Sequence, residues 1–218
     1  MAVRGAGAER LLAVALFEGS RDLAEACLEH PFVRGIADGT LEEPRFRCYV
    51  AQDAYFLEAF ARAYALAAGR SPDRDGLRAF HALVGGVLEE LELHRDYAAR
   101  WGIDLVPAPL PAASAYVHFL LAAAALEPSG HVAAAMAPCM RLYAFLGQRL
   151  ARVTAASSPY REWVETYADP EFEALAKRLE GLLERYGGDR DRIGRLYREA
   201  MRLELQFFES VWAAGAAR

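Results

Sequence analysis

Three residues of this chain combine reactive side chains with apolar surroundings. They are Cys139, Asp53 and Glu209, and each lies within a stretch that has the spacing of a buried helix face. A thiolate is a strong nucleophile, and a carboxyl group removed from water can act as a general acid or base near neutral pH. This set of side chains therefore points to nucleophilic and proton-transfer chemistry, if the fold brings the groups together.

The cysteine lies in the stretch A-P-C-M-R-L-Y, residues 137–143. Pro138 removes one helical hydrogen bond just before Cys139, and Tyr143 follows four residues later on the same helix face. A buried cysteine can also be a small core residue. A nucleophilic cysteine needs a base, a cation or a helix N-terminus nearby, and local spacing supplies none of them. The spacing by itself leaves both interpretations open.

Asp53 lies in the middle of the most aromatic helix face in the sequence. Tyr49 and Val50 precede it by four and three residues, and Phe56 and Leu57 follow at the same intervals. An ionised carboxylate is very costly to bury without a partner. We therefore expect Asp53 to hold a proton, to pair with a ligand, or to bond a neighbouring helix or a buried arginine.

Glu209 is placed similarly near the end of the chain. Met201, Leu205, Phe208 and Trp212 surround it at helical spacing. A carboxyl group buried among such side chains has a raised pKa and can carry protons near neutral pH. The alternative is a glutamate at the rim that extends into solvent.

Other signatures of chemistry are weak. Glu90 and His94 resemble half of a di-iron motif, but no second motif on another helix completes it, which predicts a surface ion pair. We expect no metal and no cofactor. Cys27, Cys48 and Cys139 are widely spaced and odd in number, which argues against a disulfide framework and for a reducing compartment.

Composition limits the class of protein. The chain has 218 residues, a net charge of -5 and no basic stripe, so we expect no nucleic-acid partner. No apolar run approaches the roughly 18 to 20 residues that a membrane helix requires. The apolar run of residues 11–17 is too short and too acidic at its flanks for a signal peptide. We expect a cytoplasmic protein.

Helical periodicity dominates the sequence, and the alternation typical of strands is almost absent. Short polar connections and Gly or Pro breaks separate seven or eight helices, so we predict an all-α, single-domain bundle over residues 1–218. Apart from an extra N-terminal segment, the first predicted helix begins near Pro44. The others cover about residues 75–99, 112–126, 132–150, 161–167, 170–186 and 191–212, with residues 128–130 as the break before the fourth of these seven helices.

Several separated motifs together resemble one family. In order they are H-P-F-V-R-G-I-A-D-G-T-L, Y-V-A-Q-D-A-Y-F-L, A-Y-V-H-F-L-L, A-P-C-M-R-L-Y, Y-R-E-W-V-E-T-Y and F-F-E-S-V-W. This set is similar to that of the thiaminase II family, also called TenA, over residues 23–212. The resemblance implies a haem oxygenase-like fold and leaves about the first 20 residues as an N-terminal extension.

The same resemblance implies an activity. Such an enzyme is an aminopyrimidine aminohydrolase that salvages thiamin breakdown products and replaces the group on the 5-methylene of a 4-amino-2-methylpyrimidine with water. By this likeness Cys139 is the nucleophile and Glu209 handles protons. Asp53 binds the amidine-like edge of the ring. The likeness also implies that four aromatic residues contact the substrate: Phe56, Tyr116, Tyr143 and Tyr167.

Phe56 departs from the family pattern, which commonly has a tyrosine at this position. The missing hydroxyl is one that would bond the catalytic glutamate, so we expect slower turnover or an altered leaving-group preference. The resemblance also implies a homotetramer. Two other functions remain open: a non-catalytic aminopyrimidine-binding or regulatory protein with the same pocket, and an oxidase related to the quinone synthase of this fold.

Overall fold

The computed structural model describes residues 11–215, and every regular element in that part of the chain is an α-helix. The predicted all-α class is confirmed, but the predicted number of helices was too low, because the described residues form ten. They are α1 Leu12–Glu18, α2 Arg21–Glu29, α3 Pro31–Asp38, α4 Glu43–Gly69, α5 Arg74–Trp101, α6 Pro111–Leu126, α7 Ser129–Leu150, α8 Arg161–Ala168, α9 Pro170–Tyr186 and α10 Arg190–Gly215.

The additional helices come from the N-terminal part of the chain. Residues 12–38 form three short helices because Gly19 and Ser20 interrupt the first, and His30 and Pro31 end the second and begin the third. Pro31 occupies the first turn of α3, where its missing N–H is not needed. Of the predicted N-terminal extension, residues 1–10 lie outside the described part of the chain.

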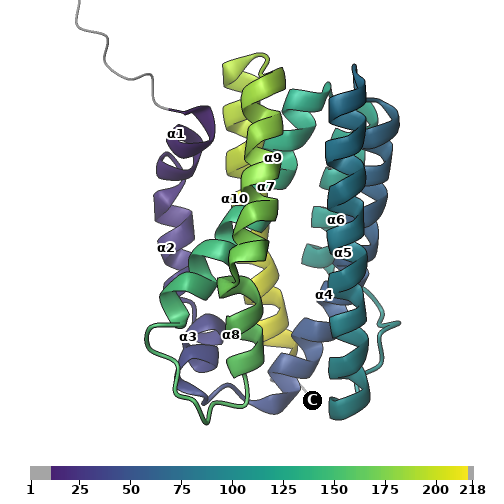
Figure 1. Ribbon diagram of the computed structural model, residues 1–218. Helices are drawn as coiled ribbons and strands as arrows, with labels where there is room; N and C mark the ends of the chain where they lie inside the picture. Colours follow the sequence, from purple (N-terminus) through teal and green to yellow (C-terminus); the bar gives the residue numbers. More distant parts are fainter. Residues whose placement is uncertain (1–10, 216–218) are drawn as a thin grey trace, which may run out of the picture.

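Three long helices provide most of the core. Helix α10 packs against both α4 and α7, and a hydrogen bond between Tyr49 and Tyr143 joins α4 to α7. Helices α5, α6 and α9 pack around these three. Figure 1 shows α4 and α5 standing together at one side of the bundle, with α7, α9 and α10 at its centre and α1 and α2 at the opposite side. Nearly all the buried apolar side chains form one continuous cluster. The predicted single domain over 1–218 stays a prediction.

Helix α7 is the most deeply buried of the long helices. Small side chains, mostly alanine, line its first half, and it continues through Pro138. Gly147 lets α8 come close, because a Cβ at that position would overlap the main chain of Tyr167. This close approach fixes Tyr167 beside the middle of the bundle. None of the helices described is both long and apolar enough to cross a membrane.

Candidate active site

Cys139 is buried in the middle of α7, with only 8% of its surface exposed. Its Sγ hydrogen-bonds the carboxyl group of Glu204 on α10. Burial, together with the nearby negative charges of Glu204, Glu90 and Asp53, raises the pKa of the thiol well above its ordinary value. The thiol therefore keeps its proton at neutral pH, and it needs a base or a bound cation to become a nucleophile.

Glu204 is the deeply buried carboxyl group of α10, with 2% of its surface exposed. The Tyr116 hydroxyl donates a hydrogen bond of 2.7 Å to its Oε1. Burial raises the pKa of Glu204 to about 8, although the bonds from Tyr116 and Cys139 oppose the shift. A carboxyl group with that pKa can both give and take a proton near neutral pH.

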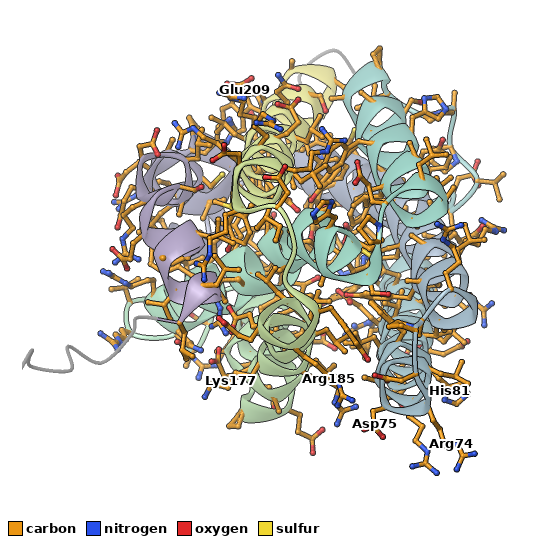
Figure 2. All side chains as sticks on the ribbon, turned by 90° about the horizontal axis from the view of Figure 1, so that it is seen from above. Arg74, Asp75, His81, Lys177, Arg185 and Glu209 are labelled. Atoms are coloured by element: carbon orange, nitrogen blue, oxygen red, sulfur yellow. The ribbon has the colours of Figure 1, made fainter. Side chains whose placement is uncertain are left out.

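Of the two positions that the spacing left open for Glu209, the structure shows the exposed one at the rim and not the buried one. Its side chain is exposed, and Figure 2 shows it at the outer edge of the molecule. The buried face predicted around Glu209 differs from the face that packs on the core by about one residue, which is roughly 100° around the helix axis. The side chains that face the core include Ala200, Glu204, Phe207 and Val211.

The sequence did hold a signal for Glu204. Ala200 and Met201 precede it by four and three residues, and Phe207 and Phe208 follow it by three and four. All four of these residues are buried. Helical spacing places apolar residues around both Glu204 and Glu209. Only the packing of α10 against α6 and α7 determines which of the two side chains is buried.

Asp53 on α4 pairs with His94 on α5. The distance between Asp53 Oδ2 and His94 Nε2 is 2.8 Å, and both side chains are buried. His94 Nδ1 lies 3.0 Å from the main-chain oxygen of Glu90, an acceptor, so that nitrogen carries a proton. Burial alone lowers the pKa of His94, but the hydrogen bond and charge of Asp53, with the charge of Glu90, raise it to about 9. At neutral pH His94 therefore carries a proton on both ring nitrogens and donates a hydrogen bond from Nε2 to Asp53 Oδ2.

One of the alternatives predicted for Asp53 was a hydrogen bond to a neighbouring helix, and the structure shows it. The partner is a histidine and not an arginine. This hydrogen bond also corrects the prediction for Glu90 and His94, which do not form a surface ion pair. His94 bonds Asp53, and Glu90 Oε1 accepts a hydrogen bond of 2.7 Å from the Tyr167 hydroxyl. Burial, reinforced by the charge of Asp53, raises the pKa of Glu90 to about 7.

The predicted aromatic residues form two ring pairs. Phe56 packs against Tyr116, which bonds Glu204, with ring centroids 4.7 Å apart. Tyr143 packs against Tyr167, also with ring centroids 4.7 Å apart. The Tyr143 hydroxyl accepts a hydrogen bond of 3.3 Å from the Tyr49 hydroxyl. Of the predicted site residues, only Glu209 lies away from this group.

Two cavities border these side chains. A small one, about 10 Å³, is lined by Tyr49, His94, Glu90 and Tyr167, among others. A larger one of about 350 Å³ continues from Glu90 towards α9. Larger hollows exist elsewhere, such as a groove of about 700 Å³ between the start of α4 and the loop after α5, but none of the predicted site residues lines that groove. Among the described residues, no group of three or more His, Cys, Asp or Glu side chains is arranged to hold a metal ion.

The helical arrangement defines the class of protein, which is an all-α protein of the haem oxygenase-like fold. Heme oxygenase-1 from the cyanobacterium Synechocystis superimposes with a TM-score of 0.61 over 95% of each chain, at 16% identity, which bears on the fold alone. The chain belongs to the TENA/THI-4/PQQC family, whose model matches residues 19–216.

Similar proteins agree with this assignment. An aminopyrimidine aminohydrolase from Halalkalibacterium halodurans is 32% identical over 92% of this chain and 95% of its own. The bifunctional TH2 protein, mitochondrial, of Arabidopsis thaliana is 36% identical over 83% of this chain, which spans only about a third of that relative's length (34%). A TenA homologue from Pyrococcus furiosus superimposes with a TM-score of 0.86 over 92% of this chain and 99% of that one, at 24% identity.

Proposed function

We propose that this chain is an aminopyrimidine aminohydrolase of the thiaminase II type. Its substrate would be 4-amino-5-aminomethyl-2-methylpyrimidine, with thiamin as a second substrate, and its product the 5-hydroxymethyl pyrimidine. The observation that carries the proposal is the hydrogen-bonded series Cys139, Glu204 and Tyr116 inside an aromatic core. A nucleophile that touches a proton carrier is what covalent hydrolysis requires. The name of the Halalkalibacterium relative supports the same substrate class.

Substrate binding begins at Asp53 in this proposal. Its Oδ2 is bonded to His94, whereas among the described residues Oδ1 accepts no hydrogen bond. That oxygen is available to the 4-amino group of the pyrimidine. The aromatic rings of Tyr143, Tyr167 and Phe56 provide flat surfaces for a flat ring.

The covalent step adds the Cys139 S–H across the C6–N1 bond of the ring. Glu204, protonated below about pH 8, gives its proton to N1, and its carboxylate then takes the proton of the thiol. A carbon–sulfur bond forms at C6, and Glu204 returns to its starting state. A positively charged ring also offsets the negative charges that raise the pKa of Cys139, so the thiol becomes easier to ionise at the moment of attack.

The adduct then loses the group on the 5-methylene. The lone pair of the 4-amino nitrogen expels the leaving group with its bonding electrons, which produces ammonia from the aminomethyl substrate or the neutral thiazole from thiamin. Water adds to the exocyclic carbon and gives up a proton, and the C6–S bond breaks to restore the aromatic ring and the thiol. Glu204 is the residue placed to carry protons in these steps, since it bonds Cys139.

A hydrolysis assay on the aminomethylpyrimidine tests the proposal. We expect the wild type to release ammonia, Cys139→Ala to be inactive, and Cys27→Ala, a matched loss of a buried thiol from α2, to remain active. An inactive wild type would leave a binding or regulatory protein as the function. Equal activity of the wild type and Cys139→Ala would exclude the nucleophile. An oxidase would be indicated instead by a stoichiometric metal in the purified protein.

The assembly and the location of the protein are also proposals. The family resemblance implies a tetramer, and exposed leucines on the outer helices, such as Leu77 and Leu88 of α5, are available for contacts between subunits. Light scattering on the purified protein gives the mass of the assembly. We also propose a cytoplasmic location, because the three widely spaced cysteines favour a reducing compartment, and cell fractionation can check it.

A further inference from the structure

One cavity beside the buried cluster has no role in the steps above. It has a volume of about 350 Å³, which lies at the lower end of the usual range for small-molecule pockets, about 300–1,000 Å³. Its inner wall includes Tyr64 of α4, Glu90 of α5 and Met140 of α7. Met140 is the residue after Cys139, and Glu90 bonds Tyr167, so the cavity begins where the proposed pyrimidine site ends.

The charged residues that line this cavity are all acidic. They are Glu89, Glu90, Asp169 and Glu171, and none of the lysine, arginine or histidine residues that the structure describes lines it. Within residues 11–215, no salt bridge joins any of the four to a basic side chain, whereas most other acidic clusters here are paired with arginine. Glu90 lies deepest, and the other three are exposed at the rim. An unneutralised acidic cavity favours a cationic ligand.

Tyr64 adds an independent observation at the inner wall. Its side chain is fully buried, and within residues 11–215 its hydroxyl has no hydrogen-bond partner. Burial, reinforced by the neighbouring acidic groups of Cys139 and Glu90, raises the pKa of this hydroxyl well above its ordinary value, so it stays neutral and can both accept and donate a hydrogen bond. Buried hydroxyls in native proteins nearly always have a partner, and an orphan on a cavity wall indicates a ligand group that completes the bond.

We propose that this acidic cavity binds the positively charged group carried by the 5-methylene of the substrate, an ammonium or a thiazolium, and that Glu90 and Tyr64 determine this preference. The inference rests on the proposed function, and it adds the recognition of the leaving group. Asp53 and the aromatic rings hold the pyrimidine, and the cavity lies on the Glu90 side of that site. Glu90 provides the charge. The Tyr64 hydroxyl oxygen accepts a hydrogen bond from the ammonium, and its O–H can donate to the ring nitrogen of the thiazole once that group has left.

Two pyrimidines of nearly equal size test the inference. The aminomethyl compound carries an ammonium group on its 5-methylene, and the hydroxymethyl compound carries a neutral hydroxyl there. Their dissociation constants are measured by calorimetry at pH 7.5 with Cys139→Ala, which does not turn over the aminomethyl compound. We expect the aminomethyl compound to bind at least about tenfold more tightly, a difference of about 1.4 kcal/mol. Adding Glu90→Gln should remove that preference and leave the affinity for the hydroxymethyl compound within about twofold.

Two further variants separate charge recognition from structural damage. Tyr64→Phe removes only the unpartnered hydroxyl, which costs the fold little, and it should also weaken binding of the aminomethyl compound selectively. Glu92→Gln removes the same charge from the solvent side of α5, where Glu92 pairs with Arg95, and it should change neither affinity. Melting temperatures show whether each variant is folded.

The possible outcomes distinguish the inference from the proposed function. If neither pyrimidine binds, both are overturned. If both bind with equal affinity, or if Glu90→Gln and Tyr64→Phe change the two affinities alike, the cavity does not recognise the cation, while the pyrimidine site stands. If Glu90→Gln is unfolded, Tyr64→Phe decides the question, and an unchanged preference in that variant overturns the role of its hydroxyl.

Discussion

His94 Nε2 lies 2.8 Å from Asp53 Oδ2, and both side chains are buried, with 5% and 6% of their surfaces exposed. The carboxyl group at the proposed pyrimidine site is therefore bonded to a protonated histidine of the neighbouring helix before any substrate arrives. A substrate that binds Asp53 does not have to provide its only counter-charge. The pair connects α4 to α5, so it also contributes to the fold.

Removing the histidine tests how much the pair stabilises the protein. His94→Leu leaves Asp53 buried without a partner, and we expect the free energy of unfolding to fall by about 3–5 kcal/mol at pH 7. Urea denaturation measures the change. The double variant Asp53→Asn with His94→Leu should recover a substantial part of that loss, because no buried charge remains. A loss below about 1 kcal/mol in His94→Leu would mean that water or another group already solvates Asp53.

The two glutamates of α10 provide a matched pair for catalysis. Glu204→Gln should lower kcat/KM for the aminomethylpyrimidine by about 10²–10⁴-fold, the usual contribution of a general acid or base. Glu209→Gln changes an exposed side chain five residues further along the same helix, and it should leave activity within about twofold. The reverse result would assign proton transfer to Glu209 and exclude the role proposed here for Glu204.

The raised pKa of Glu204 predicts how stability depends on pH. The folded state holds this proton up to about pH 8, whereas the unfolded chain releases it near 4.5, so folded protein binds more protons between these values. Its free energy of unfolding therefore decreases as pH rises through this window. The variant Glu204→Gln has no such proton, so its free energy of unfolding should not decrease for this reason. The free energy of unfolding of the variant minus that of the wild type should therefore increase between pH 5 and 8, by more than about 1.4 kcal/mol, which corresponds to one pKa unit. A constant difference between the two proteins across this range would contradict the prediction.

The ionisation of Glu204 should set the alkaline limit of activity, and the hydroxyl group that bonds it should determine at which pH that limit falls. If the acid form of Glu204 is required, kcat/KM falls above about pH 8. Tyr116→Phe removes the hydrogen bond that stabilises the carboxylate, so this limit should move to higher pH. The pH profile of the variant, compared with that of the wild type, measures the shift. An unchanged profile would show that the limit belongs to another group, such as Glu90 or His94.

Phe56→Tyr tests the departure from the family pattern. Phe56 packs against Tyr116, and a hydroxyl on its ring that reaches Glu204 would stabilise the carboxylate and move the alkaline limit to lower pH. We also expect the ratio of rates on thiamin and on the aminomethylpyrimidine to change. If both rates and the pH profile stay the same, the phenylalanine has no effect on Glu204, and the hypothesis of altered turnover is abandoned.

Much of the fold could be predicted from local patterns. Helical spacing and the Pro and Gly breaks located the long helices to within a few residues, as in α9, where the prediction and the structure agree. The helices of the N-terminal part could not be predicted in the same way, because α1 to α3 are too short to show a helical period in the sequence. Their number came only from the structure.

For the candidate site, the sequence alone determined that Asp53 and Cys139 lie on buried helix faces, because a single reactive group within an apolar stripe is visible from spacing. It could not decide between Glu204 and Glu209, since apolar residues flank both at helical intervals. The rotation of α10 about its own axis is set by the helices that pack against it, and no local pattern contains that information. Tertiary packing also decided that His94 pairs with Asp53 and that Glu90 faces a cavity, because these contacts join α5 to residues far away in the sequence.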